Sequence, residues 1–208
     1  MSPINFRKIA VSLAIFAVVA LSSSVIAKAD SVYILTNSNF AGNGNFGTVT
    51  THLNANNTIT VTVQLTPGFV IHGAGFGFNV VDPDAGVSIS NISPAAFFQS
   101  GPTSSQFDGF GNFEFSVESL QSTAQARATN TNSVTFTVSR TAGFTSDTQL
   151  AELNASGWFF AVQIAPLSST GATGFAAGAT TVPEPASMLL LGSGLLGIAA
   201  GFRKRMRK

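Results

Sequence analysis

The chain has 208 residues, no cysteine and a formal net charge of +1. This charge is unevenly distributed, because residues 30–182 hold only Arg127 and Arg140 against eight Asp and Glu residues, a net charge of −6. The acidic central segment lacks the basic surface that nucleic acid binding requires, so we expect no nucleic acid partner. The absence of cysteine excludes a disulfide framework, four-cysteine zinc sites and cysteine nucleophiles.

The first 29 residues have the pattern of a secretory signal peptide. The basic pair Arg7-Lys8 precedes an apolar stretch over residues 9–21, and Ala27-Lys28-Ala29 has the small-x-small form of a signal peptidase site. We expect cleavage after Ala29, so that the mature chain begins at Asp30. An uncleaved N-terminal anchor is the alternative. The short apolar stretch, followed by small polar residues rather than positive charge, argues against that alternative.

Residues 30–182 alternate polar and apolar side chains with a period of two, as in Thr58-Ile59-Thr60-Val61-Thr62-Val63-Gln64-Leu65. This is the pattern of a half-buried strand with one face in water. It predicts strands over residues 31–36, 48–53, 58–66, 70–81, 87–92, 112–118, 133–140 and 158–165, separated by Asn, Gly, Pro and Ser clusters. Only residues 147–154 read as a short helix. We therefore expect an all-β fold with one antiparallel β-sandwich domain, for which a jelly roll is one candidate arrangement.

The predicted core consists of the apolar residues on one face of these strands. It comprises Ile59, Val61, Val63, Leu65, Phe76, Phe78, Val80, Val87, Ile89, Phe113, Phe115, Val117, Val134, Phe136, Val138, Phe160, Val162 and Ile164. The glycines of Gly73-Ala74-Gly75-Phe76-Gly77 do not have the spacing of a dinucleotide-binding motif. We interpret them as making room for rings that pack across the sheet.

The order of segments around these glycines resembles a known module. A Thr-rich strand is followed by residues 73–83, Gly-Ala-Gly-Phe-Gly-Phe-Asn-Val-Val-Asp-Pro, and then by a strand that opens Val87-Ser88-Ile89. This order resembles the front half of cohesin-like sandwich modules over about 35 residues. The resemblance implies a sandwich fold, and we assign no dockerin partner from it.

Few residues have the arrangement of a chemical site. The sequence contains no nucleophile elbow, no HExxH and no P-loop motif. Glu114 and Glu118 are separated by about 13 Å along one predicted strand, farther than the ~5–9.5 Å between glycosidase carboxylates, and we interpret them as a solvated strand face. His52 and His72 lie in strand patterns without a nearby spaced carboxylate, which favours structural positions. We predict no enzyme activity, no cofactor and no metal site.

The segment Asp82-Pro83-Asp84-Ala85-Gly86 contains two carboxylates and a glycine, a fragment of a calcium-binding loop. It lacks the further acidic residues and the distal Glu of an EF-hand, so a tight turn is the better explanation. Whether Asp82 and Asp84 bind calcium stays open.

Four aromatic residues, Phe97, Phe98, Phe107 and Phe110, gather in a Gly/Ser-rich loop region. Sugar-binding platforms favour rings with a polar handle, and the segment has one tryptophan, Trp158, and one tyrosine. If the Phe loop is exposed, it is a candidate adhesive or self-association patch.

The C-terminal segment has three parts in a fixed order. Pro183-Glu184-Pro185 should be extended and open to a protease, since each proline lacks an N–H and fixes φ. The 17 apolar residues 186–202 would form about 25 Å of helix, slightly short of a ~30 Å hydrocarbon core. The last part is basic and holds this end in the cytoplasm, with the preceding domain outside. Its cations are Arg203, Lys204, Arg205, Arg207 and Lys208.

This order resembles the PEP-CTERM sorting signal, which has a Pro-Glu-Pro tripeptide (here Pro183, Glu184 and Pro185), a short transmembrane helix and an Arg-rich end. The resemblance implies an exported protein of a Gram-negative, exopolysaccharide-producing bacterium. It also implies an exosortase, a transpeptidase-like membrane enzyme, as processing partner and the inner membrane as transient anchor. An ordinary C-terminal anchor after a Pro-rich stalk is the alternative. That alternative does not account for the tripeptide, the short helix and the dense basic end together.

The sequence thus divides into a signal peptide (1–29), an exported domain (30–182) and a sorting signal (183–208). The lack of catalytic motifs favours a non-enzymatic structural or adhesive component of an exopolysaccharide matrix or biofilm at the cell surface. The alternative is an extracellular carbohydrate-binding module or a matrix-acting hydrolase. A carboxylate pair ~5–9.5 Å apart in the folded domain would favour the hydrolase.

Overall fold

The computed structural model describes residues 30–168 and 172–182. Several predicted features lie outside these described residues: the signal peptide with Ala27 and Ala29, the Pro183-Glu184-Pro185 tripeptide, the apolar segment 186–202 and the basic end 203–208. Within the described ranges, none of the helices has the length and apolar character that a membrane crossing needs.

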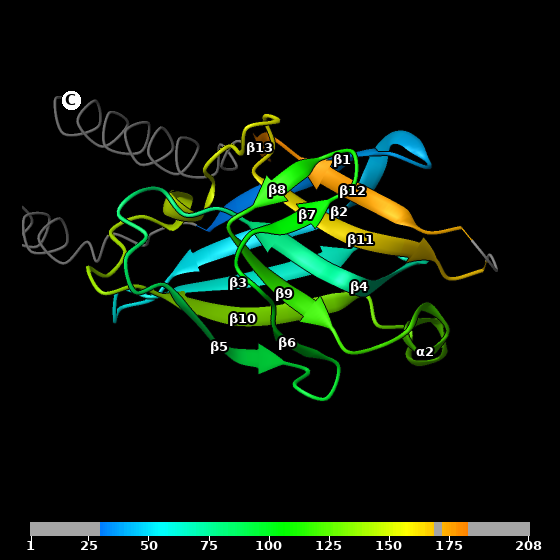
Figure 1. Ribbon diagram of the computed structural model, residues 1–208, viewed down its shortest axis with the longest axis horizontal. Helices are drawn as coiled ribbons and strands as arrows, with labels where there is room; N and C mark the ends of the chain where they lie inside the picture. The colour runs from blue at the N-terminus through cyan, green and yellow to red at the C-terminus, as the bar shows by residue number, and fades with distance from the viewer. Residues whose placement is uncertain (1–29, 169–171, 183–208) are drawn as a thin grey trace, which may run out of the picture.

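Thirteen strands and two short helical segments make up the described chain (Figure 1). In order they are β1 (Ser31–Ser38), β2 (Gly42–Leu53), β3 (Ile59–Leu65), β4 (Phe69–Phe78), β5 (Ser88–Ser93), β6 (Phe98–Ser100), β7 (Ser105–Phe107), β8 (Gly111–Phe113), β9 (Phe115–Ser119), α2 (Thr123–Thr129), β10 (Ser133–Ser139), the 3-10 helix η1 (Asp147–Leu150), β11 (Phe160–Pro166), β12 (Gly174–Gly178) and β13 (Thr180–Val182).

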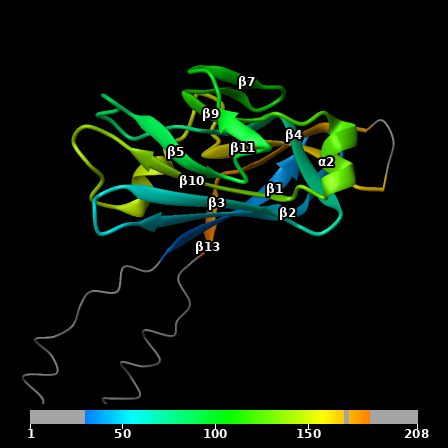
Figure 2. The same ribbon diagram turned by 90° about the horizontal axis from the view of Figure 1, so that it is seen from below.

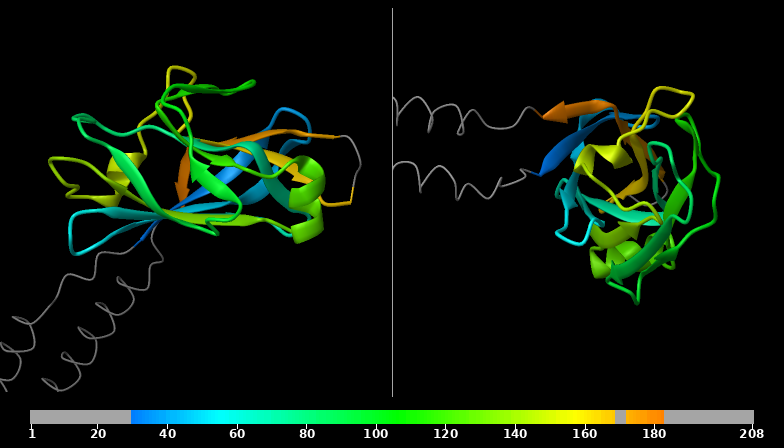
Figure 3. Two further views of the ribbon diagram at one scale, coloured as in Figure 1. Left: turned by 60° about the horizontal axis from the view of Figure 1, so that its bottom comes forward. Right: turned by 90° about the vertical axis from the view of Figure 1, so that its left-hand side faces the viewer.

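Eleven of these strands form one continuous sheet in which every strand pair is antiparallel. The order is β5-β10-β3-β2-β1-β12-β11-β4-β9-β6, and β13 pairs with β1 beside β12. The first and last strands of this order, β5 and β6, contact each other, so the sheet curls into a nearly closed barrel (Figures 1 and 3). The strands β7 and β8 form a separate hairpin.

The all-β, antiparallel prediction is confirmed, but the two separate sheets of a sandwich are not found. The reason lies in β1, which pairs with β2 on one side and with β12 and β13 on the other. These ladders join the two halves of the sheet through hydrogen bonds. The β1–β12 ladder therefore turns what the alternating pattern suggested as a sandwich into a barrel open along the β5–β6 seam.

All eight predicted strands occur, with shifted ends. The predicted strand 112–118 is interrupted at Glu114, which separates β8 from β9. The predicted helix 147–154 shrinks to the single turn η1. The structure adds α2, which sequence analysis missed. Its N-cap Ser122 and the third helical residue Gln125 form a reciprocal capping box, and Asn130 closes it in the left-handed conformation.

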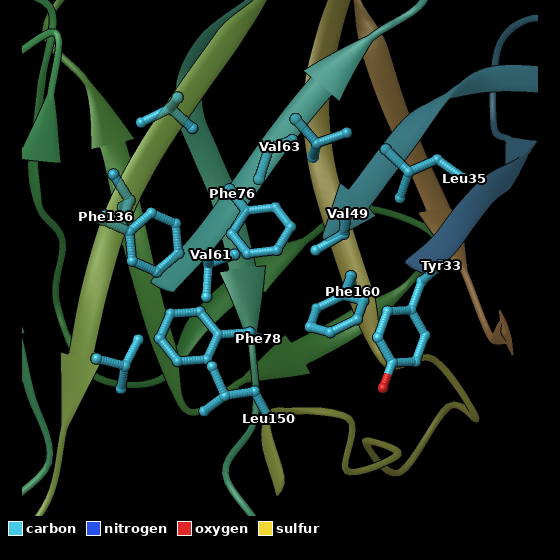
Figure 4. Close-up of a cluster of buried hydrophobic side chains, with 14 of the residues drawn as sticks. Tyr33, Leu35, Val49, Val61, Val63, Phe76, Phe78, Phe136, Leu150 and Phe160 are labelled. Atoms are coloured by element: carbon cyan, nitrogen blue, oxygen red, sulfur yellow. The ribbon is translucent and has the colours of Figure 1, made fainter. Parts of the chain in front are cut away.

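The main core lies inside the curled sheet and is dominated by phenylalanine (Figure 4). Phe76 stacks on Phe78 and Phe160, with ring centroids 6.0 and 5.6 Å apart, and Phe136 packs against both Phe76 and Phe78. Burying one such side chain stabilises the fold by roughly 1.5–3 kcal/mol. Most of the predicted core is buried here, whereas the predicted core residues Val87, Ile89 and Phe115 are only partly buried.

A second, smaller core lies on the outer face of the sheet, beneath the β7–β8 hairpin. Phe107 and Phe113 from the hairpin pack on Ala161 of β11 and Ala177 of β12. Gly77 makes room for this packing, because a Cβ there would lie 2.5 Å from the Phe107 ring. The interpretation of these glycines as space for rings is confirmed at Gly77 but wrong at Gly73 and Gly75, where a Cβ would meet the Gln163 side chain and the Val117 backbone. The hairpin therefore covers one half of the outer face, over β4, β11 and β12.

Candidate functional site

The two ends of the described chain meet at one place in the sheet. β13 runs antiparallel to β1, with Val182 opposite Val32, Thr181 opposite Tyr33 and Thr180 opposite Ile34. The start of β1 and the end of β13 therefore lie side by side (Figures 2 and 3). The next residue after β13 is Pro183, so the predicted cleavage tripeptide begins directly at the sheet.

The predicted mature N-terminus is fastened to the same region by two polar contacts. The backbone N–H of Ser31 donates to the Asp147 carboxylate at 2.7 Å, and Asp30 lies 2.6 Å from Nδ1 of His52. His52 is half exposed on β2, as expected for a surface strand residue. These contacts hold the first residues after the predicted signal peptidase site in place.

Four of the eight carboxylates of residues 30–182, those of Glu152, Glu114, Asp82 and Asp84, lie near one another, and we call this group the acidic rim. Burial raises the pKa of Glu152, and the negative charges of Glu114, Asp82 and Asp84 raise it further. Sequence analysis did not connect Glu152 with the others, because it comes from a different part of the chain and no motif links them. Among the described residues, no group of three or more His, Asp and Glu has an arrangement that would hold a metal ion.

Glu114 is exposed to solvent, as the solvated-face interpretation expected, but it lies at a break in the predicted strand rather than within it. Its carboxylate accepts a hydrogen bond from the Val80 backbone N–H at 3.1 Å, while its own N–H donates to the Asn79 side chain at 2.9 Å. It therefore lies at the break between β8 and β9 and joins that break to the end of β4. The two glutamates do not share one regular strand.

The Asp82-Pro83-Asp84 turn is stabilised by hydrogen bonds from Arg140. The guanidinium of Arg140 donates to the carbonyl oxygens of Val81, Pro83 and Gly143 at 2.7–2.9 Å and lies over the Phe144 ring. Two carbonyl oxygens beside the carboxylates are thus already bound by a cation. This contact favours the tight-turn interpretation of the segment.

Arg127, the second arginine of residues 30–182, also donates hydrogen bonds to backbone carbonyl oxygens. Arg127 on α2 donates to the carbonyl oxygens of Pro166 and Ala172 and so fastens the helix to the end of β11. The two cations of residues 30–182 therefore both bind backbone within the domain.

His72 is buried beneath α2, where its Nδ1 lies 3.2 Å from the hydroxyl of Thr123. Burial lowers the pKa of His72, and the charge of Arg127 adds to this effect, while the Ile164 backbone opposes it. The imidazole is enclosed within the domain and lies on β4, in line with its predicted position within a strand, and its buried Nε2 has no hydrogen-bond partner in the part of the chain that the structure describes.

The phenylalanine loop is not an exposed patch. Phe107, Phe110 and Phe98 are 0, 5 and 2% exposed, and Phe97 packs partly buried against the main core. Trp158 lies edge-on to Phe110 with centroids 5.2 Å apart. The adhesive-patch interpretation is therefore wrong, because hairpin β7–β8 packs Phe107 and Phe110 onto the outer face of the sheet, while Phe98 of β6 lies in the main core.

The other half of the outer face remains open and is lined by hydroxyl groups. Thr50, Thr62, Thr135 and Ser93 form one row across β2, β3, β10 and β5, and the hydroxyls of Thr62 and Thr135 lie 3.2 Å apart. These four strands contain no Asp, Glu, Lys or Arg. We call this surface the hydroxyl face; its outward residues are Thr48, Thr50, His52, Thr60, Thr62, Gln64, Ser88, Ser90, Ser93, Ser133, Thr135, Thr137 and Ser139.

The described structure thus defines an all-β domain whose last strand leads directly into a proline-flanked acidic tripeptide. The PEP-CTERM protein-sorting motif matches residues 181–205. The chain therefore carries this sorting signal, which marks an exported protein that an exosortase processes. No curated protein sequence and no solved structure matches the chain significantly.

Proposed function

We propose that the protein is an exported, non-enzymatic component of an extracellular polysaccharide matrix. Residues 186–202 hold it at the inner membrane until an exosortase cuts the chain at or next to Pro183-Glu184-Pro185. The match to the sorting motif over residues 181–205 supports export and processing by an exosortase. The hydroxyl face, whose four strands contain no Asp, Glu, Lys or Arg, is the observation that supports the role in a polysaccharide matrix.

Each part of the sorting signal has a separate task in this proposal. The cations after residue 202 fix the orientation in the membrane. The prolines keep the tripeptide extended, and Glu184 is the one charge between Glu152 and Arg203 by which an enzyme pocket could recognise the site. Recognition and anchoring are thus separable by mutation.

The sorting role is tested with the full-length chain in its own cells. Glu184→Ala should leave export and membrane insertion intact but leave the uncut precursor in the membrane fraction. Glu118→Ala, the same change within the domain, is the matched control and should be released normally. Release of the Glu184→Ala protein at the unaltered rate would reduce the tripeptide to a linker.

The hydroxyl face suits a neutral polysaccharide for reasons of solvation and spacing. Hydroxyl and amide groups both donate and accept hydrogen bonds, as sugar hydroxyls do, and an uncharged surface loses less solvation free energy when covered. Within each row, the groups on neighbouring strands lie about 4.8 Å apart. A polymer with repeating hydroxyl groups can therefore make many weak contacts at once.

This binding is tested by sedimenting the released protein with the exopolysaccharide of its own host. Thr62→Glu and Thr135→Glu each place a charge in the middle of the hydroxyl face and should reduce the bound fraction severalfold. Thr103→Glu makes the same change on the exposed loop between β6 and β7, outside the four strands of that face, and should have no effect. Equal binding by all three variants would exclude the hydroxyl face as the contact surface.

One observation favours the alternative of a matrix-acting hydrolase. Burial and the nearby charge of Glu114 raise the pKa of Glu152, and two carboxyls whose environments differ in this way are a feature of acid–base pairs in glycosidases. New reducing ends in the host polysaccharide, formed by the unaltered protein and lost in Glu152→Gln, would establish this alternative. Their absence with both proteins is the result expected for a non-enzymatic domain.

A further inference from the structure

The sorting motif starts inside the folded sheet. The match to the motif begins at residue 181, and residues 181 and 182 are the last two of β13. β13 is hydrogen-bonded to β1 on one side, and no second partner strand is found for it among the described residues. The end of the domain and the start of the signal are therefore the same strand.

This position leaves very little free chain for a processing enzyme. Only Pro183-Glu184-Pro185 separates Val182 from the apolar segment that begins at residue 186, a span of about 10 Å when extended. An active site that binds a peptide in extended form uses the backbone N–H and C=O groups of residues on both sides of the bond that breaks. On the N-terminal side these residues are 180–182, whose backbone pairs with residues 32–34 of β1.

The same backbone groups cannot serve the sheet and the enzyme at once. We propose that β13 has to detach from β1 before the tripeptide is cut, so that the β1–β13 pairing controls the rate at which the domain is released. This inference rests on the proposed cleavage at or next to Pro183-Glu184-Pro185.

The surrounding structure allows β13 to detach while the barrel stays folded. β12, which precedes it, is held between β1 and β11, with Phe160 opposite Gly178. β1 is anchored from within by Tyr33 and Leu35, which are 1 and 0% exposed, and by its ladder with β2. A three-residue strand with one partner belongs to the elements that open locally at low free-energy cost.

Gly178 marks the point at which β13 would separate. A Cβ at this position would collide with the carbonyl oxygen of Ile34, so the chain passes as close to β1 here as a glycine permits. Up to Gly178 the chain is fixed by neighbours on both sides, and from Thr180 onward by β1 alone.

The test is a removable cross-link between β1 and β13. Val32 and Val182 are direct partners, and cross-strand Cα atoms about 4.5–5.5 Å apart lie within the range that a disulfide spans. The chain has no cysteine, so in Val32→Cys/Val182→Cys only the engineered pair can form. In full-length precursor in its own cells, the oxidised form should be released at least tenfold more slowly than the unaltered chain, and added reductant should restore release.

Three controls separate this effect from others. Val182→Cys alone keeps the change beside the tripeptide without a cross-link and should be released normally. Val32→Cys/Thr50→Cys joins β1 to β2 instead, where Thr50 is the partner of Val32, and should also be released normally. Inserting a twelve-residue Gly/Ser linker after Val182 in the cross-linked chain should restore release, because it supplies free backbone beside the tripeptide.

Two results would overturn the inference: release of the oxidised Val32→Cys/Val182→Cys chain at the unaltered rate, or a block that the linker does not relieve. Failure of the underlying cleavage proposal looks different, since Glu184→Ala would then be released normally without any cross-link.

Discussion

The two halves of the outer face of the sheet differ in what covers them, and their sequences differ accordingly. On β4, β11 and β12, Gly77, Ala161 and Ala177 are small outward residues, and hairpin β7–β8 lies on them. Over β2, β3, β10 and β5 they are threonine and serine, and no described segment covers them. Small apolar residues at outward positions of a strand therefore indicate that another part of the chain packs there, whereas hydroxyl residues indicate an open face.

The largest effect should come from removing a ring on the covered half. Phe107→Ala empties a fully buried site and should lower the free energy of unfolding by about 3 kcal/mol, as measured by urea denaturation. Thr62→Ala on the hydroxyl face is the control and should change it by less than about 0.5 kcal/mol. Equal effects would remove the distinction between the two halves.

A smaller effect is expected from exchanging the residue types between the halves. Ala161→Thr adds atoms beneath the hairpin, where Ala161 is 0% exposed, and should destabilise the domain by about 1–3 kcal/mol. Thr135→Ala makes the reverse change on the open half and should be nearly neutral. If Ala161→Thr unfolds at the same urea concentration as the unaltered protein, the hairpin does not pack closely on the sheet.

The alternating pattern was sufficient to predict the long strands, because β3 and β10 each bury one face along their whole length. It could not predict β6, β7, β12 and β13, since a strand of three to five residues has too few positions to show a period. The closure of the sheet through β1 was equally hidden, because the pairing of Asn37 in β1 with Ala177 in β12 leaves no local signal. The carboxylate group at the rim was missed for the same reason: Glu152 is 38 residues from Glu114 in the sequence.

A third prediction concerns the part of the outer face covered by α2. The pKa of His72 is lowered in the folded state, so the folded chain takes up a proton less readily than the unfolded chain. The stability that His72 contributes is therefore complete above its unfolded pKa of about 6.5 and is lost as the pH falls from there through the lower folded value. His72→Gln should lack this loss, and the difference between the two curves of unfolding free energy against pH isolates it from the titration of the carboxylates. Two parallel curves would show that α2 does not enclose the imidazole.

The smallest effect is expected at the acidic rim. The raised pKa of Glu152 means that its stabilising contribution is complete below the unfolded pKa and is lost as the pH rises through the folded value. Glu152→Gln should therefore be slightly more stable than the unaltered protein at pH 7, by less than about 1 kcal/mol, with the gain disappearing in acid. Glu118→Gln, outside the group, serves as the control in the same thermal denaturation series. A loss of stability in Glu152→Gln at pH 7 would contradict the repulsion described at this rim.

The use of both arginines inside the domain affects how long the released protein survives. A trypsin-like protease must take an Arg or Lys side chain into its specificity pocket. Between Asp30 and Val182 the sequence has only Arg127, held in α2 with its guanidinium on two carbonyl oxygens, and Arg140, which is 9% exposed. Neither side chain is free to enter such a pocket while the barrel is folded. In an extracellular matrix that contains such proteases, the domain would therefore persist until something else unfolds it.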